Sequence, residues 1–296
     1  MDNFYKPLAE RTPDVQYQDN VRYILKNGEL VRDNPQKDGA LTCFGTTTRM
    51  VFNPRNGVPL LTERSMEGFW KKPIGEIFGM VNGETTIEGL ESYGCKGFWS
   101  PYRGMGAGLG LAPNDLGPGS YGAAFHDFPM PGGRTLNQFE QLLEQVKNYP
   151  GMRTHLVTPW IPFYTARGPN RKVIVAPCHG WVHVRIMNGH LHMHMHQRSG
   201  DFPLGVPNNM IQYAALHLAL CQVLRLDPGN YIHNVVDAHI YENQVGDMKE
   251  LVERKARPFP VLRLDPTVTN LFDFRVEHFL LEEYSPHPAM KIPYSP

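Results

Sequence analysis

The sequence has few cysteines, no net charge and no long apolar run. Its four cysteines stand far apart and form no CxxC pair, which argues against a disulfide scaffold and favours a reducing, cytoplasmic setting. The formal net charge of +0 gives no general attraction to nucleic acid or anionic membranes. No apolar stretch approaches the ~20 residues that span a bilayer, and the N-terminus lacks the apolar core of a signal peptide. We therefore expect a soluble protein in which any anion binding is local.

The sequence does contain enough apolar material for a large core, since 41% of its 296 residues are hydrophobic. No linker divides the chain, so we expect one domain over residues 1–296. Strands and helices follow one another without regular βαβ repetition, which indicates an α+β fold. By periodicity, residues 40–52 are predicted to form a strand with its neighbouring turn. The other predicted strands are 155–160, 171–177, 180–186, 190–197, 231–236 and 259–265, and the predicted helices are 71–81, 136–148, 210–224 and 243–256.

Residues 97–133 are crowded with glycine and proline, as in GMGAGLGLAPNDLGPGSYG. Linker composition is one explanation. The flanking aromatic residues Trp99, Tyr102, Tyr121 and Phe125 favour another, because they could anchor an ordered loop, and long loops in compact domains are often functional. We expect the ordered loop.

Cys178 is the first candidate for chemistry. It stands in APCHG directly after an apolar run, which predicts a position at the end of a strand with His179 beside it. A lone cysteine is most often a small buried hydrophobe. The assignment of a nucleophile therefore depends on the other motifs.

The segment QRSGDFPLGVPNN, residues 197–209, offers several recognition groups. Arg198 and Ser199 could bind a phosphate through a guanidinium fork and a hydroxyl. Asp201 could accept hydrogen bonds from an amino-substituted ring, and the amide of Asn209 can match the edge of a uracil ring. Taken singly, each of these residue types is more often a turn residue.

A further motif, DAHIYENQ, places His239 and Tyr241 two residues apart. On a strand, this spacing puts both side chains on one face. Two polar groups there could reach the same sugar hydroxyl.

A metal site is an alternative, because histidines alternate along one predicted strand. Residues at alternate positions of a strand share a face but lie about 6.6 Å apart, so only neighbouring pairs could share an ion. We expect these histidines to pack and form hydrogen bonds, with no metal bound. They are His190, His192, His194 and His196.

Taken together, the motifs resemble those of the thymidylate synthase family. The resemblance runs from about Gly39 to the C-terminus, in family order. It rests on the helix with GEIFGMVNGET, on DLGPGSYG, APCHG, QRSGD, LGVPNN, DAHIYEN and RKARP, and on the ending FDFRVEHFLLEEYSPHPAMK. The implied fold is the thymidylate synthase fold, a large mixed sheet with surrounding helices, and residues 1–38 form an N-terminal extension to it.

The resemblance also implies roles around a pyrimidine ring. Cys178 is similar to the nucleophile that adds to ring carbon C6, which makes C5 electron-rich. Glu76 resembles the carboxylate that moves protons around the ring carbonyl. Tyr121 resembles the tyrosine that lies near the C5 proton. Asn209 resembles the base-reading amide.

Other matches concern the rest of the nucleotide. His239 and Tyr241 resemble the pair that holds the sugar 3′-hydroxyl. Arg198 and Ser199 match phosphate ligands, and His179 belongs to the same substrate site. The implied substrate is a pyrimidine deoxynucleoside monophosphate.

The implied cosubstrate is 5,10-methylenetetrahydrofolate, with no metal. Asp201 matches the aspartate that binds the pterin, and Trp99 matches an indole that lines the folate pocket. The family forms obligate homodimers in which one sheet face lies at the interface and an arginine completes the partner's phosphate site. Arg153 fits that role.

Several departures from the family pattern concern phosphate and water. Threonine follows Arg153 where a second arginine is usual, and only Lys37 or Arg32 could replace another phosphate-binding arginine. Asn208 stands where an aromatic residue is usual, as in phage nucleotide hydroxymethylases. The chain ends in Ile-Pro-Tyr-Ser-Pro instead of a small apolar tail that excludes water.

These departures favour hydroxymethylation of dUMP, with dCMP as the second substrate because Asn209 matches uracil. The alternative enzyme is a thymidylate synthase, which reduces the one-carbon unit to a methyl group and releases dihydrofolate. A third interpretation is a catalytically idle module on the same fold, such as an RNA-binding repressor. The presence of Cys178, Glu76, Tyr121 and Asn209 together argues against it.

Overall fold

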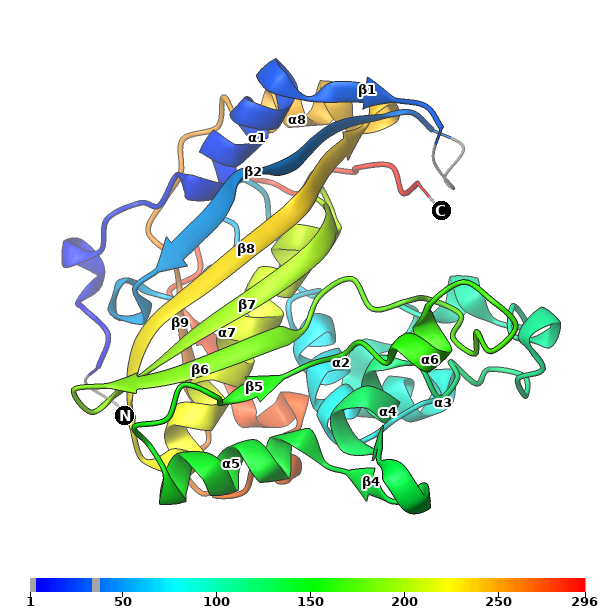
Figure 1. The fold of residues 1–296 in the computed structure, drawn as a ribbon. Coiled ribbons are helices and arrows are strands. Elements are labelled where there is room, and N and C mark those ends of the chain that lie inside the picture. The colour runs from blue at the N-terminus through cyan, green and yellow to red at the C-terminus, as the bar shows by residue number, and fades with distance from the viewer. Residues whose placement is uncertain (1–3, 34–37, 296) are drawn as a thin grey trace.

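The computed structural model describes residues 4–33 and 38–295 (Figure 1). The helices and strands mix irregularly along the chain, as predicted. The strands are β1 Glu29–Val31, β2 Ala40–Phe52, β3 Phe128–Pro129, β4 Thr135–Leu136, β5 Leu156–Val157, β6 Trp181–Met187, β7 His190–Asp201, β8 Asp227–Tyr241, β9 Val261–Leu264 and β10 Phe279–Glu282. The α-helices are α1 Gln16–Asn27, α2 Lys71–Val81, α3 Ile87–Leu90, α4 Tyr121–His126, α5 Gln138–Asn148, α6 Pro162–Thr165, α7 Gly205–Leu224 and α8 Val245–Leu251.

Within the described residues, the largest sheet has six strands in the order β1-β2-β8-β7-β6-β5. β7 and β8 run parallel, whereas the other neighbours in this sheet are antiparallel. The sheet is therefore mixed, which confirms the expected α+β fold with a large mixed sheet. The parallel register pairs Ser199 with Asp237 and Asp201 with His239, so the two strands end side by side.

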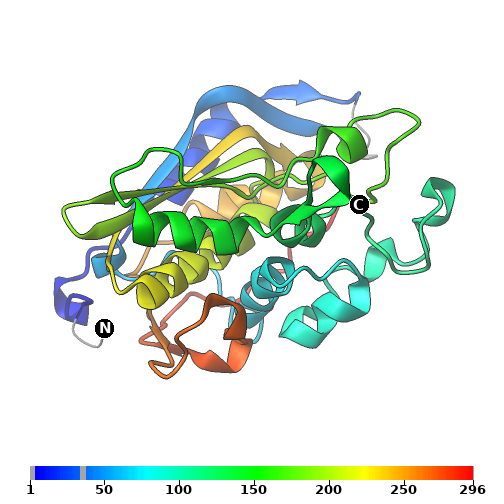
Figure 2. The ribbon, with the colours of Figure 1, turned by 60° about the horizontal axis from the view of Figure 1, so that its bottom comes forward.

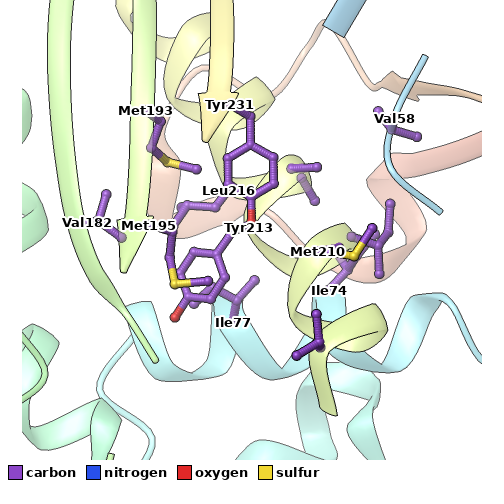
Figure 3. Packing of buried hydrophobic residues seen from close by; sticks show 14 of the residues in the cluster. Val58, Ile74, Ile77, Val182, Met193, Met195, Met210, Tyr213, Leu216 and Tyr231 are labelled. Atoms are coloured by element: carbon purple, nitrogen blue, oxygen red, sulfur yellow. The ribbon is translucent and has the colours of Figure 1, made fainter. Parts of the chain in front are cut away.

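One face of this sheet is covered by helices. In Figure 2, α5, α7 and α2 lie below the sheet, and α7 packs against β7 and β8. Figure 3 shows Met193 and Met195 of β7 close to Leu216 and Tyr213 of α7, with Ile77 of α2 beyond them. Because α7 is buried along most of its length between the sheet and α2, it can be apolar nearly all round. Among the described residues, no helix has the length and apolar character to cross a membrane.

Two sequence predictions differ from the structure near the site. Residues 171–177 form no strand, although they are rich in β-branched residues. They contact their neighbours through scattered backbone hydrogen bonds, such as Ile174 N to Leu116 O at 3.2 Å, and so form no ladder. Cys178 consequently lies in an irregular segment before β6. Helix α7 begins at Gly205, five residues earlier than expected, because Pro207 is tolerated in the first turn of a helix.

The glycine-rich segment 97–133 follows an ordered path that includes several short 3₁₀ turns. Gly117 shows why glycine is needed there. Its φ is 94°, and a Cβ atom at this position would lie 2.3 Å from the carbonyl oxygen of Lys172. The two loops can therefore approach closely only because residue 117 has no side chain. This contact holds the residues before α4 against the segment that leads to Cys178.

Candidate active site

Cys178 lies in the segment that precedes β6 and contacts β7. Its backbone carbonyl accepts a hydrogen bond from the N–H of Arg198 at 2.8 Å. The guanidinium of Arg198 lies close to the thiol, with Nη2 to Sγ at 3.3 Å. Burial raises the pKa of the Cys178 thiol, and the guanidinium partly offsets this rise. The sulfur is therefore a half-buried thiol with a permanent cation as its neighbour.

Arg198 is fixed in this position by three further contacts. Its Nε donates to the carbonyl of Pro177 at 2.7 Å, and Nη2 donates to the carbonyl of Ala176 at 3.0 Å. Its guanidinium also lies 5.6 Å from the centre of the Trp160 ring. The cation is therefore oriented before any substrate arrives.

Tyr121, in the first turn of α4, supports the loop from the other side. Its hydroxyl accepts hydrogen bonds from the backbone N–H of Cys178 at 2.7 Å and of His179 at 3.4 Å. The Tyr121 ring stacks on the His179 imidazole at 4.6 Å, and His179 Nδ1 lies 2.7 Å from the Tyr213 hydroxyl. Burial lowers the pKa of His179 to about 3, so this ring is neutral at physiological pH.

Glu76 lies on α2, and its carboxylate oxygens have different partners. Oε1 accepts from the indole Nε1 of Trp99 at 2.7 Å, and Oε2 accepts from Nε2 of Gln212 at 2.8 Å. Burial raises the pKa of Glu76 to about 7, against these hydrogen bonds, which lower it. A carboxyl with this pKa can exchange a proton near neutral pH.

Asn209 lies in α7 and uses its amide within the protein. Its Oδ1 accepts from Nε2 of Gln197 at 3.0 Å, and its Nδ2 donates to Oε1 of Gln212 at 2.8 Å. A primary amide has two donor hydrogens and two acceptor lone pairs. One donor and one acceptor of Asn209 therefore remain for a ligand.

The paired ends of β7 and β8 bring two predicted motifs together. Asp201 lies opposite His239 in the parallel register, and the rings of His239 and Tyr241 lie 5.2 Å apart on one face of β8. Burial raises the pKa of Asp201 to about 6. Ser199, next to Arg198, pairs with Asp237 two positions before Asp201.

A family model described as thymidylate synthase matches residues 15–296 of this chain. The chain belongs to the thymidylate synthase family. At the family level this means folate-dependent one-carbon transfer to dUMP, with methylenetetrahydrofolate as the cosubstrate. Most of the residues that the sequence predicts for the nucleotide site lie on α2, α4, the segment before β6, β7, α7 and β8.

Not every candidate residue lies in this cluster. Arg153 is exposed on the connection between α5 and β5, where its backbone carbonyl accepts from Nε2 of His183 at 3.0 Å. Arg32 forms an ion pair with Glu242 at 3.1 Å. Lys37 lies outside the described residues. The single chain thus brings one arginine of the predicted phosphate ligands, Arg198, to the nucleophile.

The alternating histidines occupy the sheet face that the helices leave uncovered. The side chains between them on β7 are buried, which confirms the strand and its two faces. Within residues 4–33 and 38–295, no three or more His, Cys, Asp or Glu side chains are grouped to hold a metal ion.

Sequence reasoning assigned no role to several residues that touch the site, among them Gln212 and Tyr213. Gln212 is three residues after Asn209, a spacing that places two side chains on the same face of a helix. The available signal was a glutamine within a predicted helix that is mostly apolar.

Proposed function

We propose that this protein hydroxymethylates C5 of dUMP, with 5,10-methylenetetrahydrofolate as cosubstrate, and that residues 1–296 act as one catalytic domain. The observation that carries the proposal is the 3.3 Å contact between Arg198 and the Cys178 sulfur. A fixed cation stabilises the thiolate, which is the form that attacks carbon. We assign Cys178 the attack on C6 of the pyrimidine and Glu76 the proton transfers at the ring.

The choice of uracil is supported by the amide of Asn209. Its remaining acceptor suits the N3–H of uracil, and its remaining donor suits the O4 carbonyl. Cytosine presents an acceptor at N3 and a donor at the exocyclic amine, the opposite pattern. We therefore place dUMP first and dCMP second.

The phosphate and sugar sites extend from the same cluster. Arg198 and Ser199 are proposed to bind the phosphate, and His239 with Tyr241 the 3′-hydroxyl. His179, neutral at physiological pH, contributes to the wall of this substrate site through its contact with Tyr121.

The residues proposed to hold the folate are Asp201 and Trp99. Bound folate supplies the one-carbon unit. The buried carboxyl of Asp201, with its pKa raised to about 6, is an acceptor for amino and ring N–H groups of a pterin. Trp99 is 8% exposed and tied to Glu76, so its ring can form a fixed wall.

The hydroxymethyl product is supported by the C-terminal segment, which carries polar groups to the site. The hydroxyl of Tyr294 lies 3.3 Å from that of Tyr102, whose ring packs on Trp99 at 5.5 Å. Gln244 and Asn243 hold Pro293 and Ser295. Two phenols can hydrogen-bond a water molecule beside C5, and addition of that water gives a hydroxymethyl group instead of a methyl group.

A homodimer with a shared phosphate site is part of the proposal. Arg153 is exposed beside the uncovered sheet face and is free to reach a second subunit. Cys178→Ala and Arg153→Ala homodimers should both be impaired, and subunit exchange between them should restore activity, because one site of each mixed dimer is then intact. Mixtures that stay as weak as the separate variants would contradict a crossing arginine.

The chemical identity of the nucleotide and folate products tests the proposed reaction. Purified protein is incubated with methylenetetrahydrofolate and dUMP or dCMP in separate reactions, and both products are identified by mass spectrometry. We expect hydroxymethyl-dUMP and tetrahydrofolate. The second candidate is thymidylate synthesis, favoured by the buried Trp99 ring, which restricts water. It predicts dTMP and dihydrofolate.

A further inference from the structure

We propose that Gln212 is a positioning residue that fixes the amide of Asn209 in the orientation matching uracil, through one bond to Asn209 and one to Glu76. The inference rests on the proposed function, because it requires a pyrimidine at Asn209. Gln212 is 0% exposed. A fully buried amide costs free energy unless both of its ends are hydrogen-bonded, so its two partners determine its orientation.

The orientation of Gln212 follows from Glu76. When Glu76 is ionised its oxygens only accept hydrogen bonds, so the group of Gln212 that faces Oε2 of Glu76 at 2.8 Å is Nε2. Oε1 of Gln212 is then directed at Asn209, which must present its donor, Nδ2, at 2.8 Å.

Gln197 contacts Oδ1 of Asn209 and favours the same orientation of the Asn209 amide. Its Nε2 donates to the carbonyl of Ser199 at 3.0 Å, and its Oε1 accepts from Nε2 of His233 at 2.9 Å. A carbonyl cannot donate, so this amide cannot be reversed. It therefore offers a donor to Asn209, which must present Oδ1.

Rotating the Asn209 amide by half a turn would break both bonds and oppose donor to donor and acceptor to acceptor. Rotation is the change that would let Asn209 match cytosine. A buried site whose polar groups cannot rearrange rejects the mismatched base by leaving groups unpaired. Gln212 is thus proposed to set base selectivity without touching the base.

The test is the ratio of kcat/KM for dUMP to that for dCMP. In Gln212→Met, a side chain of similar length lacks both hydrogen bonds, and we expect the ratio to fall about tenfold or more. Gln222→Met is the matched control. Gln222 is on the same helix and donates to the carbonyls of Asp265 and Val268, so its loss should leave the ratio unchanged.

A second variant covers the case in which Gln212→Met does not fold. Gln212→Asn keeps a buried amide but is one methylene too short to join Asn209 to Glu76, so its ratio should fall as well. In addition, Asn209→Asp places an acceptor against Oε1 of Gln212. The double variant Asn209→Asp/Gln212→Met should therefore use dCMP better than Asn209→Asp alone.

The outcomes separate the inference from the proposed function. A wild-type enzyme that prefers dCMP, or that converts neither nucleotide, overturns both. A wild-type preference for dUMP that survives in the folded Gln212 variants, with both kcat/KM values lowered equally, overturns only the inference and leaves Gln212 a structural residue.

Discussion

Replacing Glu76 with glutamine should change how the stability of this protein depends on pH. Burial raises the pKa of Glu76 from 4.5 to about 7. The folded chain therefore keeps this carboxyl protonated over a range in which the unfolded chain has lost the proton. The resulting stability is fully present below pH 4.5 and is lost as the pH rises through about 7.

The magnitude follows from the two pKa values. The rise from 4.5 to about 7 is a difference of about 2.5 units, and at ~1.4 kcal/mol per unit it corresponds to about 3 kcal/mol. Roughly 2 kcal/mol of this is lost between about pH 5.5 and about pH 8.5, because the loss stops once the folded carboxyl is ionised. Glutamine does not titrate, so the Glu76→Gln variant should lack this loss.

Urea unfolding at about pH 5.5, 7.0 and 8.5, followed by circular dichroism, measures the effect. The difference in unfolding free energy between variant and wild type should shift by about 2 kcal/mol in favour of the variant as the pH rises. Loss of the hydrogen bonds to Trp99 or Gln212 adds a constant to the difference in unfolding free energy but does not alter how that difference changes with pH. The exposed Glu140→Gln variant should follow the wild type. Parallel curves for Glu76→Gln and wild type would show that Glu76 is already ionised at pH 5.5 in the folded protein.

Four further predictions concern activity and folding. Cys178→Ala should lose on the order of 10⁴-fold or more in kcat while keeping the wild-type circular dichroism spectrum, and retained turnover would remove Cys178 from the mechanism. Asn209→Asp should move the kcat/KM preference from dUMP towards dCMP, since the carboxylate accepts where the amide donated; an unchanged preference would mean that the base is read elsewhere. Tyr294→Phe should lower the proportion of hydroxymethyl product measured by mass spectrometry, and an unaltered proportion would show that its hydroxyl does not hold the water. Arg11→Met should cost about 1–3 kcal/mol in urea unfolding, because the buried guanidinium pairs with Glu283 and donates to the Phe259 carbonyl, and a loss below the error of the assay would contradict that role.

Strong local periodicity explains where sequence reasoning matched the fold. The segment 40–52, predicted as a strand with its neighbouring turn, forms the strand β2 throughout, and helix 71–81 was predicted with the bounds that α2 has. Segment 40–52 alternates β-branched or aromatic residues with polar ones, segment 71–81 has apolar residues at helical spacing, and Asn82-Gly83 marks the helix end. The alternating histidines likewise identified β7 and its two faces. In each case the buried face is determined by neighbours within the same segment.

Residues 171–177 show where local reasoning fails. Their composition suits a strand, but a strand needs a partner along its length, and here the neighbouring backbone is a glycine-rich loop that meets them at scattered points. Residues 205–209 are the opposite case. Their residue types favour a turn, but they form the first turn of α7, because burial of the helix outweighs this local preference.

By itself, the sequence determined the family, the order of the motifs and the residue types available for chemistry, because these depend on identity and spacing along the chain. Only the tertiary structure decided their electrostatic state and partners. The pKa of Glu76 is raised to about 7 because the packing of α2 against α7 buries the carboxyl. The Cys178 thiol has a cation beside it because Arg198 of β7 lies against the segment that precedes β6. Desolvation and hydrogen bonding act between atoms a few ångströms apart, and those atoms come from segments separated by up to 136 residues.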